Sequence, residues 1–150
     1  MNRLLSILAL TALLPACATS GLSDAQKLDL YRAHAGTPVK DFQSFGTFSG
    51  WTPLGDHALT VWTRPNRAYL LDLTGPCPDL GFAPAISLSN QMGNVSARFD
   101  YVTVHGTGGL THIPCRIQEI RPLDVKGLKE AQRALRKADA VERERSGGGR

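Results

Sequence analysis

Histidine is the residue of this chain most able to bind metal or move protons, and its spacing predicts neither role. The sequence has four histidines, His34, His57, His105 and His112, and no HxxxH or HExxH motif. His105 and His112 enclose a six-residue loop containing glycine, so paired flanking strands would bring them face to face. Two imidazoles bind copper or zinc weakly, because a stable site needs a third or fourth ligand. We therefore expect exposed loop histidines and no metal site.

The serines and carboxylates form no recognisable catalytic group. Asp56 and His57 are of the residue types that join a serine in a catalytic triad, but the sequence contains no GxSxG motif. The following serines have no activating residue beside them in the sequence: Ser44, Ser49, Ser87, Ser89 and Ser96. The glycines at 106, 108 and 109 are followed by neither Lys-Ser/Thr nor a helix, which excludes a phosphate loop. We expect no catalytic residue and no cofactor.

An aromatic and arginine group is the candidate partner surface. Trp51, Trp62, Arg64 and Tyr69 fall within 19 residues, and these residue types are enriched at binding surfaces. The same residues also serve as core and as cation–π filler, so a structural role stays open.

The N-terminus predicts export. Arg3 precedes an apolar run from Leu4 to Leu14, which is too short for a bilayer span of about 20 residues and typical of a signal peptide. Leu14-Pro15-Ala16-Cys17 then resembles the lipobox of bacterial lipoproteins, which implies diacylation of the Cys17 thiol, cleavage before Cys17 and acylation of its amine. Two or three acyl chains anchor a protein stably. The alternative is an ordinary secretory peptide, with a soluble periplasmic or secreted product.

Once Cys17 is assigned to the lipid, two cysteines remain, Cys77 and Cys115. An oxidising compartment favours a disulfide between them, and the alternative is two free buried thiols. No CxxC motif is present, which disfavours a redox centre or a zinc ribbon.

The positive charge lies in the C-terminal part of the chain. The net charge is +4, yet residues 18–115 carry six Lys or Arg against seven Asp or Glu. A basic helix face explains this pattern, with weak contact to anionic headgroups or cell-wall polymers as the alternative. The export signal and the absence of a basic stripe interleaved with aromatic residues argue against nucleic acid as a partner.

The patterning predicts a mainly β fold. Ser23-Asp24-Ala25-Gln26 is a capping box for a short helix that ends at Gly36. Segments 58–63 and 68–73 form a hairpin around Pro65-Asn66. Leu59 and Val61 share one face and Trp62 and Leu70 lie on the opposite faces, so we expect both sides of the hairpin to be partly covered. Alternation predicts one strand over 95–104, with Val95 and Phe99 on the same face. It also predicts a further strand over 113–120, with either a bulge or the strand end near Glu119.

The chain after Asp124 is predicted to be helical, with a thin stripe of leucine and alanine. This helix would dock on the sheet or remain half-ordered. The domain organisation is then a signal peptide (1–16), a tether and the start of a helix (17–30), a disulfide-stapled β domain (31–122), a basic helix (123–145) and a tail (146–150). We expect a small antiparallel sheet or barrel-like sandwich with a helix at each end, and an α+β fold is the alternative.

Four segments carry a resemblance to a known family. They are WTPLGDHALTVWTRPNRAYLL (51–71), GPCPDL, VSARFD and PCRIQEIRPLD. They resemble a family of small lipoproteins and secreted proteins of Gram-negative bacteria that is known only as a domain of unknown function. The resemblance spans about residues 31–131. It implies an envelope location and paired cysteines, and it implies no activity.

These observations together predict a lipoprotein on the periplasmic side of the outer membrane. Ala18 follows Cys17 where sorted lipoproteins of the inner membrane carry Asp, so the resemblance implies the outer membrane. We expect a non-enzymatic binding or structural module whose partner is an envelope protein or a cell-wall polymer. The alternative is a small periplasmic enzyme or enzyme inhibitor with a cleft that the sequence does not reveal.

Overall fold

The computed structural model describes residues 21–45, 47–106 and 112–147 of the chain. Its elements in chain order are α1 (Asp24–Ala33), β1 (Asp41–Gln43), β2 (Gly50–Pro53), β3 (Ala58–Arg64), β4 (Arg67–Leu73), the 3-10 helix η1 (Leu80–Phe82), β5 (Ala85–Leu88), β6 (Asn94–Ser96), β7 (Tyr101–His105), β8 (His112–Pro122) and α2 (Val125–Gly147). The predicted signal peptide (1–16) and the predicted lipidation site Cys17 lie outside the described residues.

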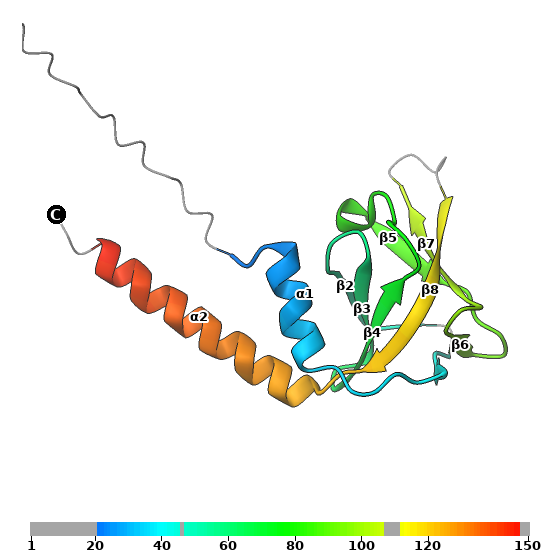
Figure 1. Cartoon of the computed structure of the whole chain (residues 1–150), viewed down its shortest axis with the longest axis horizontal. Helices are drawn as coiled ribbons and strands as arrows, with labels where there is room; N and C mark the ends of the chain where they lie inside the picture. The colour runs from blue at the N-terminus through cyan, green and yellow to red at the C-terminus, as the bar shows by residue number, and fades with distance from the viewer. Residues whose placement is uncertain (1–20, 46, 107–111, 148–150) are drawn as a thin grey trace, which may run out of the picture.

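Six strands form one antiparallel sheet in the order β2-β3-β4-β8-β7-β5, which curls into a half-barrel (Figure 1). Strands β1 and β6 form a separate two-stranded antiparallel sheet. Phe42 of β1 and Val95 of β6 belong to the same buried cluster as the half-barrel's interior residues, so the small sheet packs on that core. The predicted mainly β, antiparallel fold with a helix at each end is confirmed.

Strand β8 is shared by the two halves of the sheet. Its first half pairs with β7 and its second half pairs with β4. A register shift between Asp72 and Leu73 leaves one extra residue on β8, between Ile117 and Glu119. Of the two alternatives expected near Glu119, the structure therefore contains the bulge, and β8 continues to Pro122. The bulge changes the phase of side-chain alternation, so Ile117 and Ile120 are both fully buried although they lie three residues apart.

The β3–β4 hairpin buries apolar side chains on both of its faces, as its sequence predicts. Leu59, Val61 and Leu71 enter the main core inside the half-barrel. Ala58 and Leu70 face the other way and enter a second cluster. Leu28 and Tyr31 of α1 and Leu128 of α2 pack on that second cluster, so the two helices cover the outer face of the hairpin.

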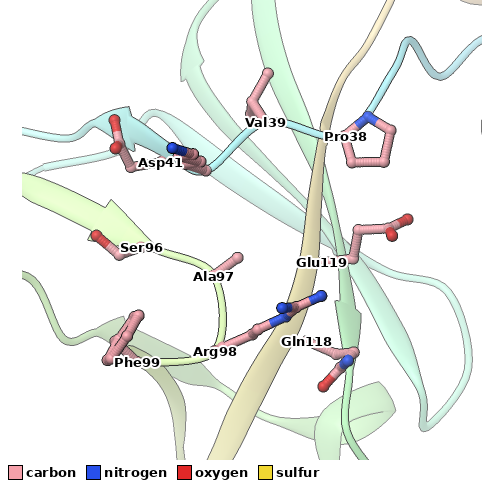
Figure 2. Close-up of a pocket in the computed structure, with 10 residues that line it drawn as sticks. Pro38, Val39, Asp41, Ser96, Ala97, Arg98, Phe99, Gln118 and Glu119 are labelled. Atoms are coloured by element: carbon pink, nitrogen blue, oxygen red, sulfur yellow. The ribbon is translucent and has the colours of Figure 1, made fainter.

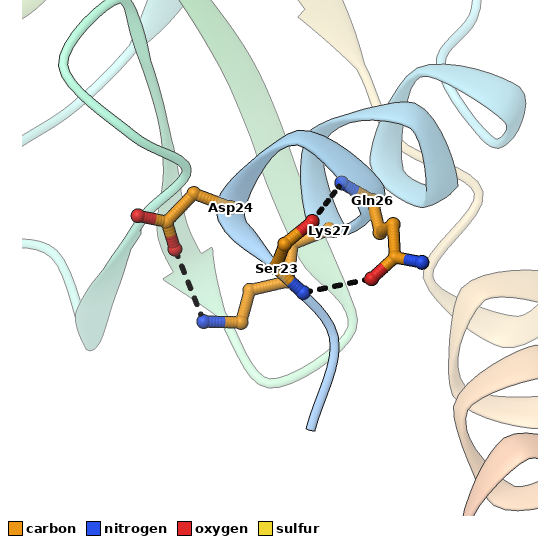
Figure 3. A network of polar contacts seen from close by, with 4 residues as sticks. All are labelled: Ser23, Asp24, Gln26 and Lys27. Carbon is orange, nitrogen blue, oxygen red and sulfur yellow. Dashed lines mark hydrogen bonds and ion pairs between the residues drawn. The ribbon is translucent and has the colours of Figure 1, made fainter. Parts of the chain in front are cut away.

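Helix α1 begins with the predicted capping box (Figure 3). The Ser23 hydroxyl accepts a hydrogen bond from the backbone N–H of Gln26, and the Gln26 side chain accepts one from the backbone N–H of Ser23. Asp24 and Lys27 add an exposed ion pair of 3.2 Å one turn apart. At the other end of the helix, Arg32 donates to Asp72 of β4 at 2.7 Å and so ties α1 to the sheet.

Helix α2 docks by its first turns only. The Asp124 carboxylate accepts a hydrogen bond from the backbone N–H of Gly127 at 3.1 Å and so caps the helix start. A Cβ on residue 127 would lie 2.5 Å from an Asp124 carboxylate oxygen, which explains the glycine in this helical turn. Val125 and Leu128 are buried, whereas every residue from 133 to 147 is exposed. None of the described helices combines the length and apolar character that a bilayer span requires.

A disulfide joins Cys77, in the connection after β4, to Cys115 on β8. Both residues belong to the main core, and Cys77 is fully buried. The two residues are 38 positions apart, so the chain-entropy estimate for this loop is a stabilisation of about 4 kcal/mol.

The prediction of one strand over 95–104 is wrong. The chain pairs over Asn94–Ser96, turns at residues 97–100 and pairs again from Tyr101. The buried Asp100 carboxylate holds this turn, because it accepts hydrogen bonds from the Ser96 backbone N–H at 2.7 Å and the Ser89 hydroxyl at 2.6 Å. The turn reverses the expected direction of Phe99, which is 72% exposed while Val95 is buried.

Truncating Leu128 to alanine should lower the free energy of unfolding by about 3 kcal/mol, because the side chain is fully buried between α2 and the sheet. Equilibrium unfolding in urea measures this loss. Leu135→Ala, seven residues further along the same helix, is the matched control and should change stability by less than about 0.5 kcal/mol. Equal losses in the two variants would contradict the docking of α2 by its first turns alone.

Removing the Asp100 carboxylate should also lower the free energy of unfolding. Asp100→Ala leaves the Ser96 N–H and the Ser89 hydroxyl without their acceptor, with an expected loss of about 2 to 4 kcal/mol in urea unfolding. Asp41→Ala removes an exposed carboxylate from the neighbouring strand and should change stability by less than about 0.5 kcal/mol. A loss at Asp100 no larger than the loss at Asp41 would refute the role of Asp100 in the turn.

Candidate functional site

A groove runs between the small β1–β6 sheet and β8 (Figure 2). Its volume is about 520 Å³. Three chain segments line it: Pro38 to Asp41, Ser96 to Phe99, and Gln118 with Glu119. The second segment is the turn that Asp100 holds, and the third is the bulge of β8, so the two irregularities of the sheet form two walls of the groove.

Arg98 and Phe99 are placed in this groove by the turn. Arg98 has a left-handed backbone with φ of 69°, which is uncommon for a residue with a side chain. Backbone hydrogen bonds hold it there: its N–H donates to the carbonyl of Ile117 at 2.7 Å, and its carbonyl accepts from the Arg116 guanidinium. Left-handed residues concentrate at functional sites, so Arg98 marks the groove as a candidate surface.

The groove is lined by two basic and two acidic side chains. Lys40 and Arg98 supply positive charge, and Asp41 and Glu119 supply negative charge. Figure 2 shows Asp41 and Glu119 on opposite sides of the groove, and Glu119 forms an ion pair with Arg121. The groove offers apolar contact and charges of both signs, which suits binding.

A second cluster lies where β5, β7 and β8 meet. His105 and His112 are directly opposed across the β7–β8 pair, as predicted, and their Nδ1 atoms are 2.8 Å apart. The Ser87 hydroxyl of β5 lies 2.8 Å from Nε2 of His105. Ser87 therefore has a histidine neighbour in space that its local sequence does not reveal. Its partner lies 18 residues away in the sequence, and only the pairing of β5 with β7 brings the two side chains together.

The four residues of the predicted aromatic surface are distributed over both faces of the sheet. Trp51 and Tyr69 pack against the main core, and Tyr69 stacks on Phe42 with ring centroids 4.4 Å apart. Trp62 packs against the second cluster, where the Lys129 ammonium of α2 lies 5.9 Å from its ring centroid. Arg64 follows a register irregularity in β3 and is exposed.

The other candidate groups considered from the sequence are a triad that uses Asp56 and His57, a metal site and the lipidation site. Asp56 and His57 are exposed, and Asp56 contributes its backbone carbonyl to the Cys77 N–H. Among residues 21–45, 47–106 and 112–147, no three His, Cys, Asp or Glu side chains form a group that could hold a metal ion. Cys17, the predicted lipidation site, lies outside these ranges.

Comparison with known proteins identifies the family of this chain. No curated protein and no solved structure matches the chain. A family model matches residues 1–139, which is most of the sequence. The chain therefore belongs to a family of unknown function, DUF6491.

Proposed function

We propose that this chain is an exported lipoprotein of the bacterial envelope and that its folded domain is a binding module without enzymatic activity. The observation that carries the location is the Cys77–Cys115 disulfide inside the main core. Disulfides persist in oxidising compartments and are rare in the cytosol. The Leu14–Cys17 motif supplies the corresponding export and anchoring signal.

The anchor would hold the domain close to the membrane. Only six residues separate Cys17 from α1, which begins at Asp24. A fully extended chain advances about 3.3 to 3.6 Å per residue, so α1 would begin within roughly 25 Å of the acylated cysteine. The binding surfaces would then be restricted to partners at or near the membrane.

The exposed half of α2 is the element best suited to a protein partner. In Figure 1 it extends away from the half-barrel, past α1. Leu135, Ala138 and Val141 follow at three-residue spacing and are all exposed, which is the pattern of a helix that lays an apolar stripe on a partner. Asp139, Glu142 and Glu144 lie among the basic residues. This mixture of signs favours a protein over an anionic lipid surface, where Lys and Arg dominate the polar face.

Intact mass spectrometry of the membrane fraction tests the location. The expected product begins at Cys17, carries acyl chains on its thiol and amine, and lacks two hydrogens because of the disulfide. Cys17→Ala is the matched control and should yield an unacylated protein that leaves the membrane fraction. A full-length wild-type chain with all thiols reactive to alkylating reagents would overturn the proposal.

Photocrosslinking in intact cells tests the binding role. A photoreactive residue at Val141 should capture one envelope protein reproducibly, because this position lies on the exposed stripe of α2. The same residue at Phe82, which is 92% exposed and lies in η1, is the control position and should give no such product. Equal yields at both positions would refute α2 as the binding element.

A further inference from the structure

In the Ser87–His105–His112 cluster the two imidazole rings lie in direct contact, and the proposed binding module does not require this contact. The two imidazoles direct the same ring atom, Nδ1, at each other across a distance of 2.8 Å. Their ring planes cross at 76°, with the centroids 4.9 Å apart. His105 and His112 are direct partners in the β7–β8 ladder, so the backbone holds the two rings in this relation.

The serine restricts the tautomer of one ring. A neutral imidazole has one protonated nitrogen and one nitrogen with a free lone pair. A hydrogen bond at one nitrogen determines which of the two carries the proton. When Nε2–H of His105 donates to the Ser87 hydroxyl at 2.8 Å, its Nδ1 carries the lone pair and faces His112. Metal-binding histidines show this arrangement, in which the second ring nitrogen donates to an outer group that orients the ring.

We propose that His105 and His112 bind a divalent transition-metal ion through their Nδ1 atoms, with copper(II) preferred. An ion about 2.0 Å from both nitrogens, with a right angle between the bonds, requires the nitrogens to be about 2.8 Å apart. The observed distance equals this separation, and in the metal-free protein one N–H···N hydrogen bond spans it. Binding therefore requires His112 to carry its proton on Nε2, and it requires both rings to tilt so that their Nδ1 lone pairs face the ion. Imidazole ligands suit copper, and the affinity order of divalent metals places copper(II) highest.

The site would be open, with protein ligands at two positions. The described residues contribute no third His, Cys, Asp or Glu, so water fills the other positions and exchanges readily with an incoming donor. Ser87 and His112 are exposed, so the ion is reached directly from solvent. Such a site binds and releases metal, and it does not depend on the lipid anchor.

The same three residues have a second chemical interpretation. With the protons reversed, Ser87 would donate to Nε2 of His105 and Nδ1–H would donate to His112, as in a nucleophilic relay. Such a relay gains its effect in a site that excludes water, whereas Ser87 and His112 are exposed. The exposure therefore favours the metal, and the relay becomes an outcome of the test.

Copper(II) titration of the full chain, purified without a polyhistidine tag and with glycine as a competing chelator, tests the proposal. The wild type should bind one ion per chain, with an electron paramagnetic resonance spectrum that shows coupling to imidazole nitrogen. His105→Ala and His112→Ala should each weaken binding by about tenfold or more and lose part of that coupling. Ser87→Ala should weaken binding by less, and zinc(II) should bind the wild type more weakly than copper(II).

His57→Ala is the matched control, because it removes another exposed histidine and should leave the titration unchanged. Thermal unfolding of each variant checks that the domain stays folded, as expected because none of these side chains belongs to either hydrophobic core cluster. Identical titrations for the wild type and the His105→Ala/His112→Ala double variant would overturn the proposal. So would covalent labelling of Ser87 by a fluorophosphonate that requires His105, in a protein that binds no copper above that double variant.

Discussion

The fold depends on strand β8 serving two partners. Its first half hydrogen-bonds to β7 and its second half to β4, and the bulge between them changes the phase of the side chains. Without that change, Ile117 and Ile120 would point to opposite faces of the sheet. With it, both enter the main core, and the sheet can curl around one apolar centre. Cys115 lies on the first half of this strand, so the disulfide links the connection after β4 to the strand that closes the core.

The bulge of β8 and the turn at residues 97–100 also form the walls of the groove. The bulge of β8 supplies one wall of the groove in Figure 2, and the turn at residues 97–100 supplies another. The Asp100 carboxylate is buried to hold that turn, and it leaves Arg98 in a left-handed conformation and Phe99 in solvent. A regular strand over this segment would have buried Phe99 and removed the groove wall. The candidate groove is therefore lined by the residues at which the backbone is irregular.

Helix α2 has a first part that packs on the sheet and a second part that is exposed to solvent. Leu128 and the capped first turn fix α2 on the outer face of the β3–β4 hairpin, beside α1. From residue 133 to residue 147 every side chain of α2 is exposed. The resulting arrangement joins a tightly packed domain to an exposed helical arm, and it places the accessible apolar stripe at a distance from both the groove and the histidine pair.

The sequence alone determined the features that depend on neighbouring residues. The capping box at Ser23, the two-faced β3–β4 hairpin, the break in alternation near Glu119 and the opposition of His105 and His112 all follow from periodicity or short-range spacing, and the structure contains each of them. The tertiary structure alone decided what depends on distant residues. Ser87 reaches His105 only through the β5–β7 register, Asp100 breaks its strand by accepting from Ser89 as well as Ser96, and Trp62 and Tyr69 pack on opposite faces. The physical reason is that strand pairing joins residues far apart in the chain, and local patterns carry no information about which pairs will meet.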